Sequence, residues 1–338
     1  MSDATTTRRD AKRRRALLRW YEKNARPLLW RRRPNPYRIW VAEIMLQQTR
    51  IAVVEPAYRR FLEAFPTLAA LARAEQEEVL SHWSGLGYYS RARSLHRAAR
   101  ELHARGAKSF PKKWADAMDL PGVGTYTAAA VLSIAYGEPY AAVDGNVIRV
   151  LSRLERLGLP DGGGEPHRTI ADRLLARGRP GDWNQALMEL GETICLPKGP
   201  RCDVCPLQST CAAFEAGVVE RHPPPKPRRA IQRLGLEVTV LRDRRGRLLL
   251  ERGAFEHLDH LWLPPTRKLA APPARADFKH AIVHRSFEVA VETRTVPTAE
   301  LRRRAGEPTA GVERRVVDPQ DLTRLGRSSL LTKALRHA

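Results

Sequence analysis

The sequence predicts a mainly helical domain followed by a smaller domain that contains β-strands. Apolar residues recur at helical spacing from Ala16 to about Val219. The segment 221–229 reads RHPPPKPRR and cannot continue a helix, because its prolines lack backbone donors. Strand patterns follow it. For a chain of 338 residues we therefore expect two domains, 1–219 and 231–338, joined by a Pro/Arg-rich linker at 220–230.

The chain is strongly basic, and its charge bounds the class of partner. It holds 59 Lys and Arg against 37 Asp and Glu, a formal net charge of +22. This surplus predicts attraction to a polyanion, with nucleic acid first and an anionic membrane surface second. Residues 1–15 lack the apolar stretch of a secretory signal, and no later stretch approaches the length of a membrane span. We expect a cytoplasmic protein without membrane attachment, and we read the basic run at 12–15 as a solvated helix start or a frayed end.

Within the helical part, prolines at 34, 56, 66, 111 and 121 predict breaks between helices. The helix predicted at 39–48 carries Glu43 among apolar residues. A carboxyl group in such surroundings is partly desolvated, which raises its pKa and keeps a proton available near neutral pH. The alternative is a glutamate on the exposed stripe of an amphipathic helix.

A glycine hairpin precedes the next apolar helix. The segment 120–124 reads LPGVG and leads into the helix predicted at 126–136. Gly122 and Gly124 would let the backbone approach a phosphate while free amides point at it, although a plain connector is the alternative. Asp144 follows in the segment VDGNV. An aspartate at a helix start is most often an N-cap.

All four cysteines of the chain fall within one short segment, at Cys195, Cys202, Cys205 and Cys211. A disulfide framework would be spread over a chain of this length, so the cluster indicates one closed metal site. One CxxC core with unequal arms suits an iron–sulfur cluster better than the paired short hairpins of zinc. Zinc and unliganded structural cysteines remain alternatives.

The C-terminal domain begins with a predicted β-hairpin. Leu234 to Leu241 and Arg247 to Arg252 flank a tight turn at 243–246. Ser286 to Thr293 alternates cleanly and predicts another strand. The domain is therefore small and contains β-structure.

Together these motifs resemble the helix-hairpin-helix DNA glycosylases of the endonuclease III and MutY group. The cysteine spacing matches their iron–sulfur loop, and the segments MLQQT (45–49) and LGYY (86–89) are similar to MutY-type adenine DNA glycosylases. The resemblance covers Trp20 to about Val219. It implies a mainly α fold, namely a helix-hairpin-helix DNA glycosylase domain. An iron–sulfur loop of this domain would hold a 4Fe-4S cluster. A small α+β Nudix-like C-terminal domain without a Nudix box completes the expected architecture.

The resemblance also implies a reaction and its catalytic residues. Such a protein would be a monofunctional adenine DNA glycosylase of base excision repair, acting on double-stranded DNA with adenine opposite 8-oxoguanine or guanine. Glu43 would protonate adenine and then handle the attacking water, and Asp144 would stabilise the cationic sugar. Tyr126 would bond near Glu43, and Asn146 would position the sugar or water. Relatives that also nick the backbone carry a lysine at the position of Tyr126, and tyrosine cannot form their imine.

The resemblance also implies further residues that contact DNA. Three match the wedge that fills the gap left by an extruded base, although each could be core packing: Gln48, Leu86 and Tyr88. Three match the lining of an adenine pocket: Arg26, Trp30 and Gln185. In the loop that reads 8-oxoguanine, the family order Phe, Ser, His becomes Ile282, Val283, His284.

The altered loop puts lesion selectivity in doubt. A valine cannot form the hydrogen bond of a serine hydroxyl, and His284 could be an ordinary surface histidine. The stretch between Trp262 and His280 is also short for such a domain. Adenine excision itself does not depend on these departures.

Two other functions remain open. One is a glycosylase for another mispaired base, such as thymine opposite guanine, for which Glu43 would be an unusual residue. The other is a catalytically silent iron–sulfur DNA-binding protein, which would have no need of both Glu43 and Asp144. Endonuclease III activity is disfavoured by Tyr126 and Glu43 together. We expect a monomer associated with DNA.

Overall fold

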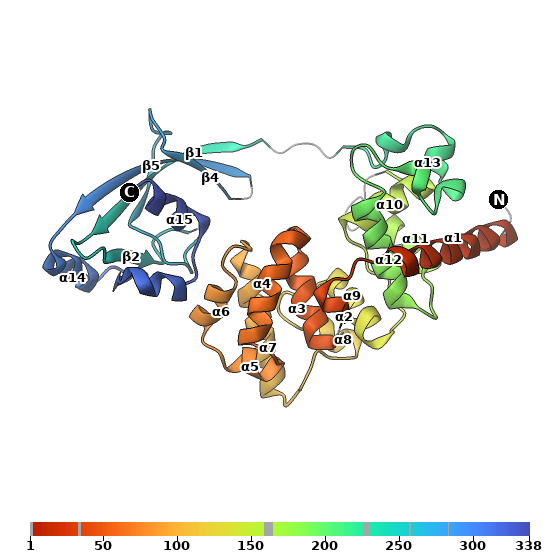
Figure 1. Ribbon diagram of the computed structural model, residues 1–338, viewed down its shortest axis with the longest axis horizontal. Coiled ribbons are helices and arrows are strands. Elements are labelled where there is room, and N and C mark those ends of the chain that lie inside the picture. The colour runs from red at the N-terminus through yellow and green to blue at the C-terminus, as the bar shows by residue number, and fades with distance from the viewer. Residues whose placement is uncertain (1–2, 33–34, 159–164, 226–229, 257, 283) are drawn as a thin grey trace. The chain divides into compact units, whose positions relative to one another are not determined.

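The computed structural model describes residues 3–32, 35–158, 165–225, 230–256, 258–282 and 284–338 (Figure 1). The chain forms two compact units that interleave along the sequence. Unit one comprises Met1–Ile51, Thr67–Ala69 and Arg97–Pro227, and unit two comprises Ala52–Pro66, Ala70–His96 and Arg228–Ala338. A set of helices before residue 97 thus groups with the C-terminal region. The domain limits drawn from the sequence stay a prediction, and residues 226–229 of its linker lie outside the described residues.

Unit one is helical throughout its described part. Its longer helices are α1 (Asp3–Asn24), α3 (Pro36–Leu46), α9 (Thr125–Tyr136), α10 (Gly145–Glu155), α11 (Glu165–Leu174) and α12 (Pro180–Thr193). Shorter pieces are α2 (Leu29–Arg32), α8 (Trp114–Met118), α13 (Ala212–Glu215) and the 3-10 turns η1 (Cys202–Val204), η2 (Gln208–Thr210) and η3 (Val219–Arg221). The predicted helical character of this region is confirmed.

A buried core joins α1, α10, α11 and α12, with Leu17, Leu151, Leu174, Trp183 and Leu187 among its members. Helix α1 begins well before Ala16, at Asp3. The basic segment is helical because its Arg13 is 1% exposed and donates to Glu155 at 2.6 Å. Asp10, also buried, pairs with Arg173 of α11. The expected solvated start or frayed end at 12–15 is therefore wrong for Arg13, which these contacts bury within a regular turn of α1.

In unit two, the helices are α4 (Ile51–Ala64), α6 (Gln76–His82) and α7 (Tyr89–Ala104), with the short α5 (Leu68–Arg73). Helices α5 and α7 each cross the limit between the two units. The predicted break at Pro56 is wrong, because Pro56 lies inside α4. Val54, Tyr58 and Phe61 bury one face of α4, and this packing offsets the backbone bond that proline cannot make.

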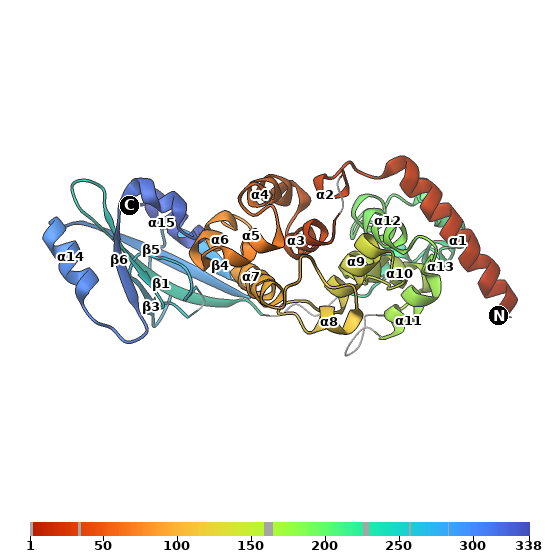
Figure 2. The ribbon, with the colours of Figure 1, turned by 90° about the horizontal axis from the view of Figure 1, so that it is seen from below.

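The rest of unit two is a sheet with a helix on each face (Figure 2). Its strands are β1 (Gln232–Arg242), β2 (Leu248–Arg252), β3 (Thr266–Leu269), β4 (Phe278–Ile282), β5 (Arg285–Thr295) and β6 (Glu313–Val317). The order is β4-β5-β1-β2-β6, with β3 also paired to β1, and the β1–β5 pair is parallel. Helix α15 (Ser329–Arg336) packs over Leu236, Val238 and Leu250, and α14 (Thr298–Gly306) packs over Leu241 and Leu249. The predicted hairpin and the strand at 286–293 are confirmed.

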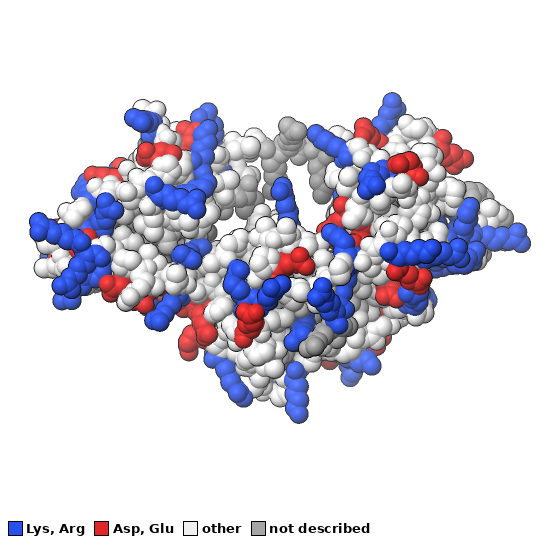
Figure 3. Space-filling model, in the orientation of Figure 1, with Lys and Arg blue, Asp and Glu red and all other residues white. Residues whose placement is uncertain are grey.

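Basic side chains are spread over the face of the molecule seen in Figure 3, with a group of them along α1. The excess of Lys and Arg in the sequence therefore lies at the surface of both units. No helix in the described ranges combines the length and apolarity that crossing a lipid bilayer requires.

Candidate active site

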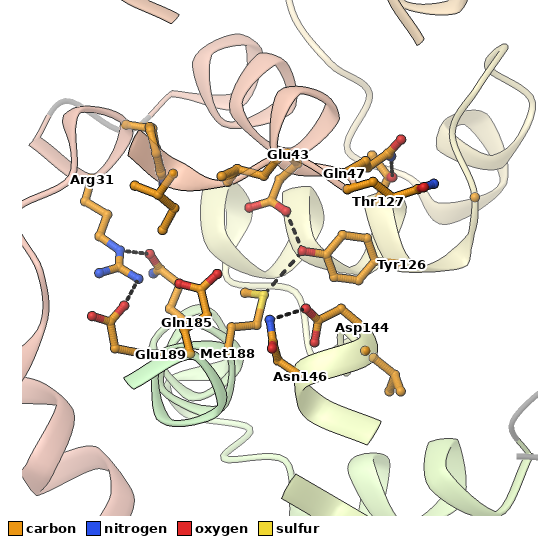
Figure 4. A pocket seen from close by; sticks show the side chains of 18 of the residues that line it. Arg31, Glu43, Gln47, Tyr126, Thr127, Asp144, Asn146, Gln185, Met188 and Glu189 are labelled. Carbon is orange, nitrogen blue, oxygen red and sulfur yellow. Dashed lines mark hydrogen bonds and ion pairs between the residues drawn. The ribbon is translucent and has the colours of Figure 1, made fainter. Parts of the chain in front are cut away.

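Unit one contains a cavity of about 520 Å³ between α2, α3, α9, α10 and α12. It brings together residues far apart in the sequence (Figure 4). Those singled out from the sequence that line it are Arg26, Trp30, Glu43, Gln48, Gly124, Tyr126, Asp144, Asn146 and Gln185. Both carboxyl groups proposed from the sequence thus belong to one cavity.

Glu43 is a buried acid within this cavity. It lies on α3, whose other buried residues are apolar or aromatic, and it is 4% exposed. Burial raises its pKa from 4.5 to about 7, although Tyr126 lowers it by donating from its hydroxyl to Oε2 at 2.6 Å. Glu43 can therefore carry a proton near neutral pH, as its apolar neighbours in the sequence predict.

Asp144 is the N-cap of α10, and its carboxyl group also lines the cavity. Its Oδ1 accepts from the Val147 amide at 2.7 Å, and its Oδ2 accepts from Asn146 Nδ2 at 3.0 Å. Burial raises the pKa of Asp144, whereas these two donors lower it. The two carboxyl groups of the cavity therefore differ in environment, since Asp144 has several donors on its ionised form.

Asn146 has both ends of its side-chain amide engaged by protein groups. Its Oδ1 accepts from Arg149 Nη2 at 2.8 Å, while its Nδ2 donates to Asp144. Arg149 in turn donates to the backbone oxygens of Gly191 and Cys195. A Cβ on Gly191 would lie 2.7 Å from the Asn146 Cβ, so this close packing requires glycine. Asn146 is thus placed to orient Asp144.

Tyr126 connects the hairpin to the acid. It lies in the first turn of α9, and its hydroxyl contacts both Glu43 Oε2 and Met188 Sδ, the latter at 3.3 Å. Burial and the nearby carboxylates raise the pKa of Tyr126 well above 10.0. The phenol is therefore a neutral donor at physiological pH.

The opposite wall of the cavity is a network of charged and amide groups. Arg31 donates to Gln185 Oε1 at 3.0 Å and to Glu189 Oε2 at 2.9 Å. Arg26 pairs with Glu189 and Glu192, and these ion pairs raise its pKa further. Trp30, 6% exposed, adds an aromatic surface. A planar group with hydrogen-bonding edges suits such a wall.

Sequence reasoning missed several residues of this wall, among them Arg31, Met188, Glu189 and Glu192. Three of them follow Gln185 on α12 at helical spacing, so they share its face. That spacing is the signal that could have found them. Arg31 follows Trp30 directly and offered no periodic signal.

The hairpin has the predicted tight geometry. Gly122 adopts a φ of +76°, which favours glycine, and Gly124 is the N-cap of α9 with no side-chain bond to the helix. The first amides of α9 therefore lack a capping side chain. This arrangement fits the predicted approach of a phosphate.

The four cysteines line a second cavity in unit one, together with apolar residues that include Leu190, Ile194 and Leu207. Arg153 of α10, 2% exposed, donates to Cys195 Sγ at 3.3 Å and to the Leu196 oxygen at 2.7 Å. In the part of the chain that the structure describes, no three Cys, His, Asp or Glu side chains group as ligands of one metal ion. Thiolates are ligands of both zinc and iron–sulfur clusters, so the chemistry of this lining fits either group.

The three residues matched to the wedge do not all lie at the cavity, which Gln48 alone of them lines. Gln48 lies in unit one, whereas Leu86 and Tyr88 lie in unit two. Tyr88 is 46% exposed and Leu86 is only 5% exposed, so Tyr88 alone of this pair stands at the surface. His284 is exposed in the turn between β4 and β5, and Val283 lies outside the described residues.

Comparison with known proteins shows which proteins parts of this chain are similar to. The description "HhH-GPD superfamily base excision DNA repair protein" matches residues 41–162. Over 215 residues the chain is 45% identical to an adenine DNA glycosylase of Rattus norvegicus, covering 60% of this chain and 42% of that protein. Over 227 residues it is 41% identical to an adenine DNA glycosylase of Schizosaccharomyces pombe, covering 60% and 49%. The chain thus spans less than half the length of these curated relatives.

Solved structures show a similar fold over about three fifths of this chain. A thermostable thymine-DNA glycosylase aligns with a TM-score of 0.56 and 27% identity, covering 62% of this chain and 99% of that chain. An endonuclease III in a non-covalent DNA complex aligns with a TM-score of 0.52 and 24% identity, covering 60% and 92%. The second likeness concerns the fold alone.

Proposed function

We propose that this chain is a monofunctional adenine DNA glycosylase, because its residues 41–162 match the HhH-GPD superfamily of base excision DNA repair proteins. Its substrate would be duplex DNA in which adenine is mispaired with 8-oxoguanine or guanine. The observation that carries the proposal is a buried acid with a pKa of about 7, Glu43, in one cavity with the carboxyl group of Asp144. Sequence similarity to adenine DNA glycosylases favours adenine as the base.

Breaking the bond between adenine and its sugar leaves both electrons of that bond on the base. Glu43 gives its proton to adenine, so the base departs as a neutral molecule. The sugar becomes an oxocarbenium-like cation, and the ionised carboxylate of Asp144 stabilises that charge. Water then attacks the sugar carbon, and Glu43 takes up the proton that the water releases. The acid is thereby restored.

Asn146 and Tyr126 would act through the two carboxyl groups. Asn146 and Arg149 hold Asp144 in orientation, and the Tyr126 hydroxyl fixes one oxygen of Glu43. Tyr126 also supplies no amine, so backbone nicking through an imine is not expected. The wall of Arg26, Trp30 and Gln185 would hold the extruded purine.

The rate of base release should fall as pH rises through about 7, since the reaction needs the protonated form of Glu43. Tyr126→Phe removes a donor that stabilises ionised Glu43, so the pKa of Glu43 should rise and the alkaline limb should move to higher pH. Single-turnover rates across pH for both proteins measure this shift. A limb that stays in place, or moves to lower pH, would contradict the assignment of the proton to Glu43.

The four cysteines would hold a 4Fe-4S cluster. Cys195, Cys202, Cys205 and Cys211 are all partly buried around one apolar cavity, and thiolates are the ligands that such clusters require. The bound cluster would supply a rigid centre that organises the basic loop for DNA contact. Arg153 neutralises part of the thiolate charge and binds the loop backbone.

Purified protein should therefore be coloured and contain about four irons per chain. Replacing Cys202 with serine should lower iron content and visible absorbance together. Stoichiometric zinc in a colourless protein would refute the iron assignment while leaving the glycosylase proposal standing.

The opposite base would be read by the C-terminal region, as in the Nudix-like domain that the resemblance implies. His284 is exposed and available for this role. The exchange of serine for valine at 283 predicts weaker preference for 8-oxoguanine over guanine. We place the protein on DNA in the cytoplasm, as a monomer.

The deciding experiment is single-turnover base release from four duplexes. Three carry adenine opposite 8-oxoguanine, guanine or cytosine, and the fourth carries thymine opposite guanine. Fast adenine release opposite 8-oxoguanine without strand nicking is the expected result. Thymine release instead would favour a glycosylase for another mispair, and tight binding without any release would favour a silent DNA-binding protein.

A further inference from the structure

The loop Gly85–Tyr88, between α6 and α7, is held in an unusual conformation. Three of its residues have positive φ: Gly85 at +93°, Gly87 at +67° and Tyr88 at +47°. Tyrosine rarely adopts this region, because its Cβ crowds the backbone. The loop nevertheless presents the Tyr88 ring to solvent with 46% of the residue exposed. Something in the surroundings must hold this conformation.

Arg91, in the first turn of α7, contacts the loop from the inside. Its Nη2 donates to the backbone oxygens of Leu86 and Gly87, both at 3.2 Å. Its guanidinium lies 5.4 Å from the Tyr88 ring centre and 5.5 Å from that of Trp83. One side chain therefore fixes both the path of the loop and the ring at its tip.

Trp83 completes this inner support. It is fully buried and donates from Nε1 to the Gly87 oxygen at 3.1 Å. The Gly87 oxygen thus accepts from both Trp83 and Arg91. Burial lowers the pKa of Arg91 only to about 10, so it stays charged at neutral pH.

A segment of the C-terminal region supports the loop from the other side, within unit two. The Arg327 amide donates to Ser84 Oγ at 3.1 Å, and the Tyr89 hydroxyl donates to the Arg327 oxygen. The flanking residues Ser84 and Tyr89 are therefore both tied to one peptide segment. Gly326 allows this approach, because a Cβ there would lie 2.8 Å from the Cβ of Leu80.

We propose that Arg91 and the Gly326–Arg327 segment are positioning elements that hold the Gly85–Tyr88 loop ready to enter a DNA duplex beside an extruded base. The inference rests on the proposed function, in which the target base leaves the stack. A loop already in its working conformation spends no binding energy on ordering itself. Arg91 acts through Tyr88 and the loop backbone, not on the reacting atoms.

The Gly85–Tyr88 loop also borders a cavity of about 550 Å³ within unit two. Tyr88, Arg93, His260 and Ser329 are among the residues that line this cavity. Because the supports lie on the helices and on the C-terminal segment, loss of either should disturb the loop. The C-terminal region would therefore contribute to base extrusion as well as to reading the opposite base.

The test uses Arg91→Lys, which keeps the charge but loses the two-point hydrogen bonding and the flat stacking surface. Arg100→Lys is the matched control, since Arg100 is exposed on the same helix. The first substrate is a duplex that is paired everywhere except at one mismatch containing adenine. Release of adenine from it should fall by about tenfold or more in Arg91→Lys. Release from a bubble, where adenine is already unstacked, should stay within about twofold of the parent protein, because little unstacking remains to be done.

A second readout does not depend on base release. With 2-aminopurine at the target position and Glu43→Gln to prevent cleavage, binding should raise fluorescence as the base unstacks. Adding Arg91→Lys should lower that rise, and adding Arg100→Lys should not. Gly326→Ala should act like Arg91→Lys on both readouts, from the opposite side of the loop.

Each outcome separates the two proposals. Equal losses on the mismatch and the bubble would overturn the positioning role and indicate a general effect on binding or folding. Unchanged rates and fluorescence would overturn it as well. If the parent protein released no adenine from either substrate, the proposed function would fail, and the fluorescence would still decide the role of Arg91.

Discussion

Replacing Glu43 with glutamine is expected to lower adenine release by about a hundredfold to ten-thousandfold, the usual contribution of general acid catalysis. Glutamine has almost the same shape and can still accept the Tyr126 hydroxyl bond, but it carries no transferable proton. Burial is what makes the native acid effective, since it raises the pKa to about 7. Single-turnover rates on adenine opposite 8-oxoguanine measure the loss.

Duplex affinity provides the complementary readout for this variant. It should stay close to that of the parent protein, because Glu43 lies within the cavity and removing a negative charge does not weaken contact with phosphate. Glu63→Gln, an exposed residue on α4, controls for the change in charge alone. An active Glu43→Gln protein would falsify the assignment of the acid.

Replacing Asp144 with asparagine is expected to lower the rate by about a hundredfold or more, because the carboxylate charge that faces the developing cation is lost. Asparagine is an N-cap of similar quality, so Oδ1 can still accept from the Val147 amide. Its amide would then face Asn146 Nδ2 in place of an oxygen, so some stability should be lost as well. The rate should be measured well below the unfolding midpoint of the variant.

Comparing alanine with asparagine at position 144 separates capping from catalysis. Alanine removes the cap and the charge together, so it should cost about 1 kcal/mol of unfolding free energy in addition to the rate. A folded asparagine variant with the parent rate would show that Asp144 is only a cap. A slow but stable asparagine variant would establish the catalytic role.

The parts of the site that follow from local sequence could be predicted. Glu43 has apolar neighbours on both sides, and these are enough to foresee its burial. The motifs around Asp144 and Tyr126 indicate these two residues, and both line the cavity. The N-cap that an aspartate at a helix start predicts is also present, because Asp144 caps α10 and lines the cavity at once.

Other parts depend on contacts that no local pattern records. Arg149 reaches the Cys195 backbone oxygen across 46 positions of sequence separation, and so joins the cysteine segment to Asn146. Pro56 lies inside a helix because packing outweighs the local preference against it. The interleaving of the two units along the sequence likewise arises from tertiary contacts. The linker, by contrast, is predicted from its proline and arginine content alone.

The way unit two is assembled determines what a truncated chain would lose. Trp262 donates to Glu77 of α6, and Arg315 lies beside both of them, so the C-terminal region completes the surface of helices encoded far upstream. A chain that ended in the linker would therefore lose more than the sheet and its two helices. It would uncover Leu80 and leave Ser84 and Tyr89 without their Arg327 contacts. Chains truncated at that point should be less stable in the region of α6 and the start of α7, which lies in unit two.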